Sequence, residues 1–397
     1  MNYDFDLLID RCNTNSLKYD FAAERGMPAD LLPLWVADMD FQAPKEVLDA
    51  ITNVVSHGIF GYSEIKKDYF EILHSWFYRN FNWDTKDAWL VKTPGVVYAL
   101  AMAVRAFTKE GDGVLIQQPV YYPFQDIIQK NNRRVVVNSL VYQDGTYSID
   151  FKDFEQKIIS ENVKLFILCS PHNPVGRVWS KEELIKLGEI CLKHNVIIAS
   201  DEIHCDFIYP GYSHTVFAAI REDFAENTIV CTAPSKTFNL AGLQVSNIFI
   251  KNELLRKKFK NEIAKSGYSQ LNTLGLAACK AAYQYGEEWL NELRAYLYDN
   301  LNYVRAFLKE KLPLVKLIEP QGTYLIWLDF SALALSSKEL EDLIVKKAKL
   351  WLDPGFIFGK DGEGFERINI ACPRATLQKA LEQLEQAVNE INTSMSN

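Results

Sequence analysis

Residues 228–242 read Thr-Ile-Val-Cys-Thr-Ala-Pro-Ser-Lys-Thr-Phe-Asn-Leu-Ala-Gly, an apolar run followed by a short segment of small and polar residues around Lys236. The run 228–232 is typical of a buried strand in a parallel sheet, and the small residues after it suit a tight return. Functional groups of open α/β sheets lie just beyond the carboxyl ends of strands. The sequence therefore predicts an α/β fold that presents Lys236 on a turn for covalent chemistry, as a Schiff-base lysine.

Helical and strand-like patterns alternate through the middle of the chain, which predicts a mostly parallel sheet with helices on both faces. Seven strands are expected, one near the first helical region and the others at 114–117, 134–140, 164–169, 196–200, 228–232 and 246–250. Helices are expected at 44–56, 65–80, 96–109, 181–194 and 252–264.

The pattern changes after a long helical region at 273–311. Short strands are expected at 314–318, 323–329 and 367–370, with helices at 337–349 and 376–391. This mixture indicates a second, smaller α+β unit. We expect a large cofactor-binding domain at 45–285 and a small domain formed by 1–44 together with 286–397.

Composition excludes several classes of partner. The chain has 397 residues and a net charge of −8, and its basic residues do not cluster, so nucleic acid is not an expected partner. No apolar run approaches the roughly 18 residues that span a bilayer, and residues 1–10 do not resemble a signal peptide, so a soluble, cytoplasmic protein is expected. Seven scattered cysteines and six histidines show no metal-binding spacing, and no metal site is expected.

Two more polar residues follow predicted strands. Asp201 ends an apolar strand, and Asn173 lies in a loop with two prolines and a glycine, where its amide could donate to a ligand oxygen. A lone aspartate in this position is more often a helix cap or a surface acid. However, Asn173, Asp201 and Lys236 are spaced by 28 and 35 residues, about one strand-helix-strand unit each. One shared site is the simplest explanation.

A fourth element has the features of an anion site. Residues 92–99 read Lys-Thr-Pro-Gly-Val-Val-Tyr-Ala, and the proline and glycine stand where a helix begins. The first N–H groups of a helix have no partner within it, so they suit a phosphate. An ordinary helix start is the alternative interpretation of this segment.

Five strings of the sequence carry a family resemblance. They are Pro33–Phe41, Ser170–Trp179, Ser200–His204, Ala233–Gly242 and Ala371–Thr376. With them, the chain resembles pyridoxal-phosphate enzymes of fold type I, in the aminotransferase class I/II superfamily. Within that superfamily it is most similar to the MalY/PatB group of cystathionine β-lyases, or C–S lyases. The resemblance covers nearly the whole chain, and it implies a three-layer large domain around a mostly parallel seven-stranded sheet.

The resemblance also implies roles for the strand-end residues. Lys236 would hold pyridoxal 5′-phosphate as a Schiff base and then act as the base, which requires its pKa to fall below the usual value of about 10.4. Asp201 would pair with the pyridinium nitrogen, which makes the ring an electron sink. Asn173 would bind the phenolic oxygen O3′, and Tyr121 would stack on the ring and take part in catalysis.

The same resemblance implies how the phosphate and the substrate are held. The phosphate would be bound by Gly95, Val96, Val97, Ser235 and, across a homodimer interface, Tyr62 of a second subunit. Arg374 would take the α-carboxylate of an amino-acid substrate through a bidentate pair, with Asn173 and Tyr62 also in contact with the substrate. His204 would either approach a cofactor oxygen or pack as a neutral side chain.

Two departures from the aminotransferase pattern favour a lyase. Many aminotransferases have an arginine eight residues after the lysine, where this chain has Gln244, and many have a tyrosine where this chain has His204. We therefore expect a β-lyase that cleaves cystathionine or other S-substituted cysteines to a thiol, pyruvate and ammonia. An aminotransferase is one alternative. A regulatory protein that acts by binding a partner protein is the other.

Overall fold

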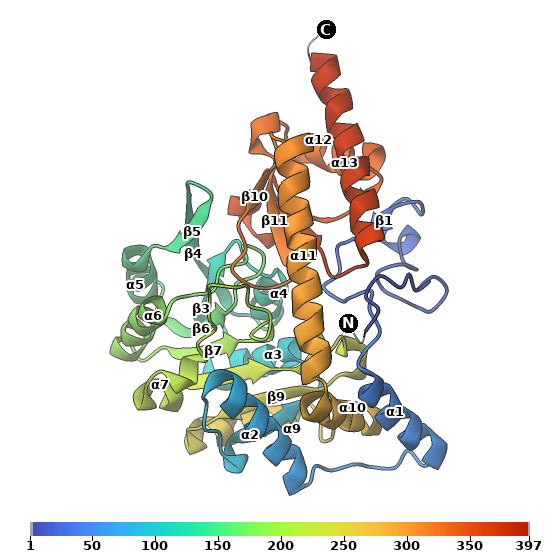
Figure 1. The fold of residues 1–397 in the computed structure, drawn as a ribbon. Coiled ribbons are helices and arrows are strands. Elements are labelled where there is room, and N and C mark those ends of the chain that lie inside the picture. The colour runs from blue at the N-terminus through green and yellow to red at the C-terminus, as the bar shows by residue number, and fades with distance from the viewer. Residues whose placement is uncertain (1–2, 396–397) are drawn as a thin grey trace.

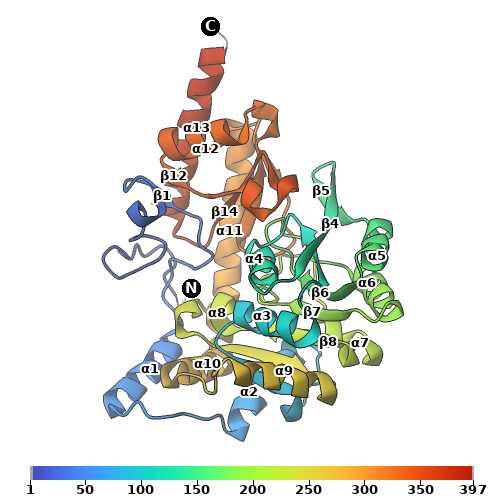
Figure 2. The ribbon, with the colours of Figure 1, turned by 180° about the vertical axis from the view of Figure 1, so that it is seen from behind.

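The structure is a computed structural model that describes residues 3–395, and the side chains of residues 3–391. It contains a large sheet surrounded by helices and a smaller antiparallel sheet, and the long helix α11 (Glu287–Lys311) extends from beside α10 (Thr273–Tyr285) to beside the smaller sheet (Figure 1). Seen from behind, the smaller sheet lies beside the end of the larger one (Figure 2). The carboxyl end of the chain lies at the far end of α13 (Arg374–Met395).

The large sheet has eight strands in the order β2-β9-β8-β7-β6-β3-β4-β5. Their bounds are β2 Leu90–Thr93, β3 Gly113–Gln118, β4 Arg134–Gln143, β5 Thr146–Ile149, β6 Val163–Cys169, β7 Ile197–Asp201, β8 Thr228–Thr232 and β9 Ser246–Ile250. The five neighbouring strands from β8 to β4 are parallel, whereas β2, β9 and β5 pair antiparallel with their neighbours. The predicted α/β fold with a mostly parallel sheet is thus confirmed.

The strand β5, which makes the sheet eight-stranded instead of seven-stranded, was not predicted. It pairs with β4 as a hairpin through Asp144 and Gly145, which both have positive φ angles, of 51° and 79°. An Asp-Gly pair is the usual signal for a tight turn between two strands. The strand β5 that follows the turn has only four residues, which is too short for the sequence pattern to predict it as a separate element.

Helices cover both faces of the large sheet, as expected. They are α1 Lys45–His57, α2 Lys67–Phe81, α3 Val96–Phe107, α4 Pro123–Lys130, α5 Phe151–Ser160, α6 Lys181–Lys193, α7 Glu222–Glu226, α8 Pro234–Thr237, α9 Glu253–Lys265 and α10 Thr273–Tyr285. Alternate residues of β6 join two different cores: Leu165 packs with α3 and α9, and Phe166 packs with α5 and α6. The short helices α4 and α5 were not predicted.

The smaller sheet has the order β10-β11-β14-β13, and all its pairs are antiparallel. Its strands are β10 Lys316–Ile318, β11 Leu325–Asp329, β13 Asp353–Pro354 and β14 Phe365–Asn369, and the helix α12 Ser337–Asp342 lies between β11 and β13 in sequence. The N-terminal segment joins this part of the molecule, because β1 (Leu32–Pro33) pairs with β12 (Leu350–Trp351). The domain boundaries proposed above stay a prediction.

The predicted helical region 273–311 is two helices, α10 and α11, that meet at Gly286. A Cβ atom at this glycine would lie 2.5 Å from the ring of Phe238. The position therefore requires a glycine, because a larger side chain would collide with Phe238, which follows Lys236 by only two positions.

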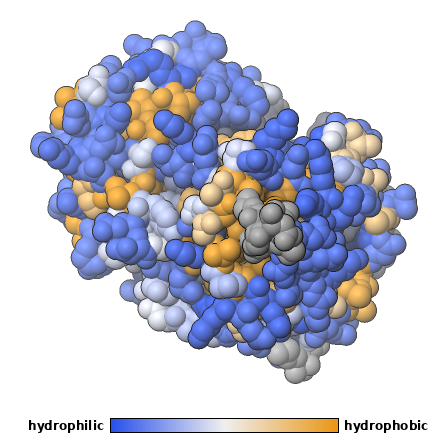
Figure 3. Space-filling view, turned by 90° about the horizontal axis from the view of Figure 1, so that it is seen from above, coloured by the Kyte–Doolittle hydropathy of each residue, from blue (hydrophilic) through white to orange (hydrophobic). Residues whose placement is uncertain are grey.

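The outer surface is mostly hydrophilic, with apolar residues in several separate patches on the face that Figure 3 shows. No helix among the described residues is long and apolar enough to cross a membrane.

Candidate active site

The carboxyl ends of three neighbouring strands, β6, β7 and β8, form the floor of the candidate site. Cys169, Asp201 and Cys231 lie in one row across these strands. The loop after β6 carries Asn173, and the four-residue helix α8 after β8 carries Lys236. Parallel strands end at the same edge of the sheet, and this geometry brings the three polar side chains to one place.

A cavity of about 180 Å³ lies above this edge. The predicted site residues that border it are Gly95, Val96, Val97, Tyr121, Asn173, Asp201, His204, Ser235 and Lys236. Four residues that we did not predict complete its wall, namely Ala37, Cys169, Ile203 and Ala241. The cavity thus gathers nine of the predicted residues, although their individual roles stay predictions.

Lys236 directs its amine into this cavity. Its Nζ donates a hydrogen bond of 2.8 Å to the carbonyl oxygen of Ala37, and part of the side chain faces the cavity. Burial lowers the pKa of Lys236 to about 8, with Arg367 acting in the same direction and Asp38 and Asp201 opposing it. A lysine with such a pKa has a sizeable neutral fraction near pH 7.5, as a nucleophile or a base requires.

Asp201 is a buried carboxylate that accepts a hydrogen bond of 3.1 Å from the N–H of Ile203. Burial raises its pKa to about 7, and the charge of Lys236 opposes this rise. A carboxylate in these surroundings is destabilised unless a cationic or N–H group reaches it. The site therefore favours a ligand that carries a protonated nitrogen at this point.

The amino end of α3 also borders the cavity. Gly95 precedes the helix, and no side chain caps its first N–H groups. These groups, from Val96 and Val97, lie with Ser235 in the cavity wall. Such a helix end favours an anion, and its twelve-residue length supports a full dipole.

Arg367, on β14, reaches the same site and was not predicted. Its Nη1 donates to Oδ1 of Asn173 over 3.0 Å, and its Nη2 donates to the carbonyl oxygen of Trp35 over 2.8 Å and pairs with Asp353. The residue is only 2% exposed. An arginine within a predicted core strand is a signal that sequence analysis could have used, because buried arginines are rare without a partner or a function.

Arg374 lies elsewhere in the structure. Its Nε donates to Oδ1 of Asn300 over 2.7 Å, and its guanidinium lies 4.8 Å from the ring centre of Tyr303. It borders a different cavity, beside Asp4 and Phe5. The arginine that bonds the site residue Asn173 is Arg367, seven residues earlier, and the role of Arg374 in binding the substrate carboxylate stays a prediction.

Three other residues considered in the sequence differ in their relation to the cavity: His204 borders it, and Tyr62 and Gln244 do not. Tyr62 is 99% exposed and borders a separate surface cavity with residues 267–274, so it does not reach Lys236 of its own chain. Burial holds the pKa of His204 well below its usual value, and its Nδ1 has no hydrogen-bond partner among the described residues, so this histidine is neutral. Gln244 is exposed and does not border the cavity.

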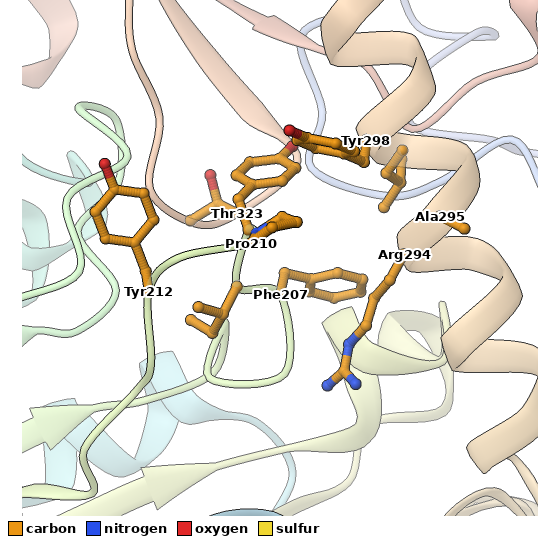
Figure 4. Close-up of a pocket in the computed structure, with 10 residues that line it drawn as sticks. Phe207, Pro210, Tyr212, Arg294, Ala295, Tyr298 and Thr323 are labelled. Atoms are coloured by element: carbon orange, nitrogen blue, oxygen red, sulfur yellow. The ribbon is translucent and has the colours of Figure 1, made fainter.

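A larger cavity, of about 440 Å³, lies between the loop after β7 and α11. Figure 4 shows Tyr212, Pro210 and Phe207 on that loop and Arg294 and Tyr298 along α11. The guanidinium of Arg294 points away from the aromatic rings, and its Nε donates to the carbonyl oxygen of Asp206 over 2.6 Å. Because the guanidinium of Arg294 is already hydrogen-bonded, this cavity lacks the convergent polar groups of the smaller one.

Comparison with known proteins agrees with this geometry. Residues 29–384 match the family Aminotransferase class I and II. Cystathionine beta-lyase PatB of Bacillus subtilis (strain 168) is 46% identical, over 97% of this chain and all of PatB. Protein MalY of Escherichia coli (strain K12) is 34% identical, over 98% of this chain and all of MalY. The crystal structure of cystalysin from Treponema denticola, which contains pyridoxal 5′-phosphate, matches with a TM-score of 0.95 and 41% identity, over 98% of this chain and all of cystalysin. The predicted resemblance is confirmed, and the chain belongs to the aminotransferase class I and II family.

Proposed function

We propose that this protein is a pyridoxal-phosphate-dependent carbon–sulfur β-lyase that cleaves cystathionine or other S-substituted cysteines to a thiol, pyruvate and ammonia. The observation that carries the proposal is the convergence of a depressed-pKa lysine, Lys236, and a buried carboxylate, Asp201, beside an open helix end. The similarity to the cystathionine beta-lyase PatB supports the reaction, and the similarity to cystalysin, whose crystal structure contains pyridoxal 5′-phosphate, supports the cofactor.

The described residues fit this cofactor. Asp201 needs a protonated nitrogen, the open end of α3 with Ser235 needs an anion, and Lys236 can react with an aldehyde. Asn173 can donate to an oxygen through its amide, because its Oδ1 already accepts from Arg367. Tyr121, with its pKa raised by burial, stays a neutral ring that can cover one face. When bound, the cofactor supplies an electron sink for the electron pair left at Cα.

The chain's own residues then move the protons. Neutral Lys236 can take the proton from Cα of the substrate and deliver one to the leaving sulfur. Asp201 stays ionised when a protonated nitrogen lies against it, and it fixes that proton in place. The cavity, of about 180 Å³, combines these polar groups with apolar ones such as Ala37, Val96 and Ile203, which limit the room for water beside the reacting carbon.

Arg367 is proposed to bind the α-carboxylate of the substrate. We expect Arg367→Lys to lower kcat/KM by about 100-fold, mainly through KM, because an ammonium cannot replace the bidentate guanidinium. Arg374→Lys is the matched control, and we expect it to change kcat/KM by less than about threefold, since Arg374 bonds Asn300 and borders a different cavity. Steady-state kinetics on one S-substituted cysteine measure both. The reverse order of effects would restore Arg374 to the role first predicted for it.

The reaction itself is tested with purified holoprotein. We expect pyruvate and a free thiol from cystathionine and from S-alkyl cysteines, detected by coupled lactate dehydrogenase and by a thiol reagent. Formation of pyridoxamine phosphate on incubation with amino acids, without pyruvate, would identify an aminotransferase instead. Testing several S-substituents also reveals the preferred substrate, because one methylene is worth only about 1 to 3 kcal/mol in such a pocket.

We further propose a homodimer in which Tyr62 completes the phosphate site of the second subunit. The exposure of Ile59, Phe60 and Tyr62, which are 68%, 61% and 99% exposed, supports this proposal, because consecutive apolar side chains at a surface usually mark an interface. Sedimentation velocity tests it, and a species with the mass of one chain at assay concentrations would contradict it. The cytoplasmic location expected from the sequence stays a prediction.

A further inference from the structure

The N-terminal segment Trp35–Phe41 lies directly over the lysine turn. Its residue Ala37 borders the cavity and accepts, at one carbonyl oxygen, the Nζ of Lys236 over 2.8 Å and the hydroxyl of Tyr324 over 2.9 Å. This carbonyl is the hydrogen-bond acceptor that the structure gives to the lysine amine. The exact place of the segment therefore decides where the amine points.

Two asparagines fasten the backbone of this segment. Asn369, on β14, donates to the carbonyl oxygens of Val36 and Asp38 over 2.7 and 2.6 Å. Asn239, three residues after Lys236, accepts from the N–H of Met39 over 2.9 Å and donates to the carbonyl oxygens of Met39 and Phe41. These bonds tie the segment to the lysine turn on one side and to the smaller sheet on the other.

A cluster of four charges holds the side chains of the same segment. Lys18 is completely buried, and its Nζ lies 2.7 Å from Asp40 and 3.7 Å from Asp38. Arg11 pairs with the same two carboxylates, over 2.7 Å to Asp40 and 2.6 Å to Asp38. The ring of Tyr19 packs against both cations. The cluster contains two positive and two negative charges, so it is balanced only when both cations are present.

This balance matters for Lys236 because Asp38 is the neighbour of Ala37. The ionisable groups around Lys236 are Asp38 on this segment, Cys169 on β6, Asp201 and His204 on and after β7, Arg367 on β14, and the hydroxyls of Tyr121 and Tyr324. Asp38 and Asp201 favour the protonated amine, and Arg367 disfavours it. Lys18 and Arg11 offset the negative charge of Asp38 and Asp40. Loss of one cation would leave a net negative charge next to the amine in a buried region, where screening is weak.

We propose that Lys18, assisted by Arg11, is a positioning residue of the active site: it fixes and neutralises Asp38 and Asp40, holds the Ala37 carbonyl against Lys236, and so keeps the lysine nitrogen easy to deprotonate. Complete burial of an ammonium is costly, and it is rare without a partner or a function. The role of Lys236 in catalysis rests on the proposed function, whereas the link between Lys18 and the ionisation of Lys236 does not depend on which reaction is catalysed.

The test is a pH titration of Lys18→Met by two readouts that do not depend on turnover. The first is the absorption of the holoprotein, whose pH midpoint reports the proton on the cofactor-linked lysine nitrogen. The second is the rate at which formaldehyde and cyanoborohydride methylate Lys236 in the full chain without cofactor, followed by peptide mass spectrometry. We expect both midpoints to rise by about one pH unit, which makes methylation at pH 7.5 about tenfold slower.

Three further variants decide between charge and mere packing. Lys18→Arg should keep the wild-type midpoints, and Lys18→Met combined with Asp40→Asn, which restores the charge balance, should return them to within about 0.3 units. Lys45→Met, which removes an exposed lysine paired with Asp49, should leave them unchanged.

Two outcomes would overturn the proposal. One is a Lys18→Met protein that melts at a lower temperature but titrates as wild type, and the other is a double variant that titrates like the single one. If Lys18→Met does not fold, Arg11→Met, at a partly exposed position, carries the same test, and unchanged midpoints would overturn the proposal. A protein that forms no pyruvate but shows the expected shifts would contradict only the proposed function.

Discussion

Lys236→Ala is expected to lower kcat/KM for S-substituted cysteines by about 10³-fold or more, because it removes both the covalent attachment of the cofactor and the base that takes the Cα proton. The cavity wall contains no second lysine to replace it. The fold should survive, since the Ala37 carbonyl still accepts from Tyr324 and Asp201 keeps the hydrogen bond from the N–H of Ile203. Pyruvate release and the absorption spectrum of the purified variant measure the effect.

Lys130→Ala is the matched control, because Lys130 is exposed and pairs with Asp126 at the surface. We expect wild-type kinetics from it. Turnover by Lys236→Ala within about tenfold of wild type would contradict the assignment of the base. The same variant separates the regulatory alternative from the enzyme, since a role that consists only of binding a partner protein would persist without turnover.

Asp201→Asn is expected to lower kcat by about 10² to 10³-fold while stabilising the protein without cofactor. An amide cannot keep the pyridinium nitrogen protonated, so the electron sink is weakened. In the empty site, however, the ionised carboxylate is buried with a single backbone donor, and its removal relieves a destabilising charge. A gain in stability with a loss of activity is the usual sign of a functional charge.

The pH dependence of this stability difference has a definite sign. Burial raises the pKa of Asp201 from 3.8 to about 7, so the folded chain without cofactor binds this proton more tightly than the unfolded chain. Ionisation therefore costs the wild type stability as pH rises from about 4 to 7, and the cost is constant above that. The shift sets an upper bound of about 4 kcal/mol on the advantage of Asp201→Asn at pH 8, and little advantage is expected near pH 4.

Urea unfolding of the chain without cofactor at several pH values between 4 and 8 measures this difference. Asp126→Asn, at an exposed position, serves as the control and should track the wild type. If Asp201→Asn were less stable than the wild type at pH 8, the carboxylate would have a structural partner, and its proposed pairing with the cofactor would lose its main support.

The floor of the site could be predicted because it depends on local signals. An apolar strand followed by a polar residue places that residue at the carboxyl edge of the sheet, and three such strands in sequence order became neighbours in space. For Asn173, Asp201 and Lys236, strand patterning was therefore enough to expect a shared location. The open end of α3 followed from the proline and glycine before it.

The wall that comes from distant parts of the chain could not be predicted in this way. Ala37 reaches the cavity, and Arg367 reaches Asn173 in its wall, through long-range packing of the N-terminal segment and of β14, and a strand pattern does not reveal which element packs over which edge. The family resemblance points to the arginine in the string 371–376, whereas the arginine that the fold carries into the core is Arg367, on β14. The requirement for Gly286 likewise depends on a ring that is distant in sequence.

The hydrogen bonds of Arg367 have one more consequence. Its guanidinium is neutralised by Asp353 and held by Asn173 and Trp35, so this buried cation has its partners within the protein itself. The Arg367 side chain is therefore preorganised by the fold, and little rearrangement of it is needed when a substrate binds. The rate of substrate binding then depends on diffusion into a preorganised site. Selectivity among thioethers depends on the shape of the space that holds the group beyond the sulfur.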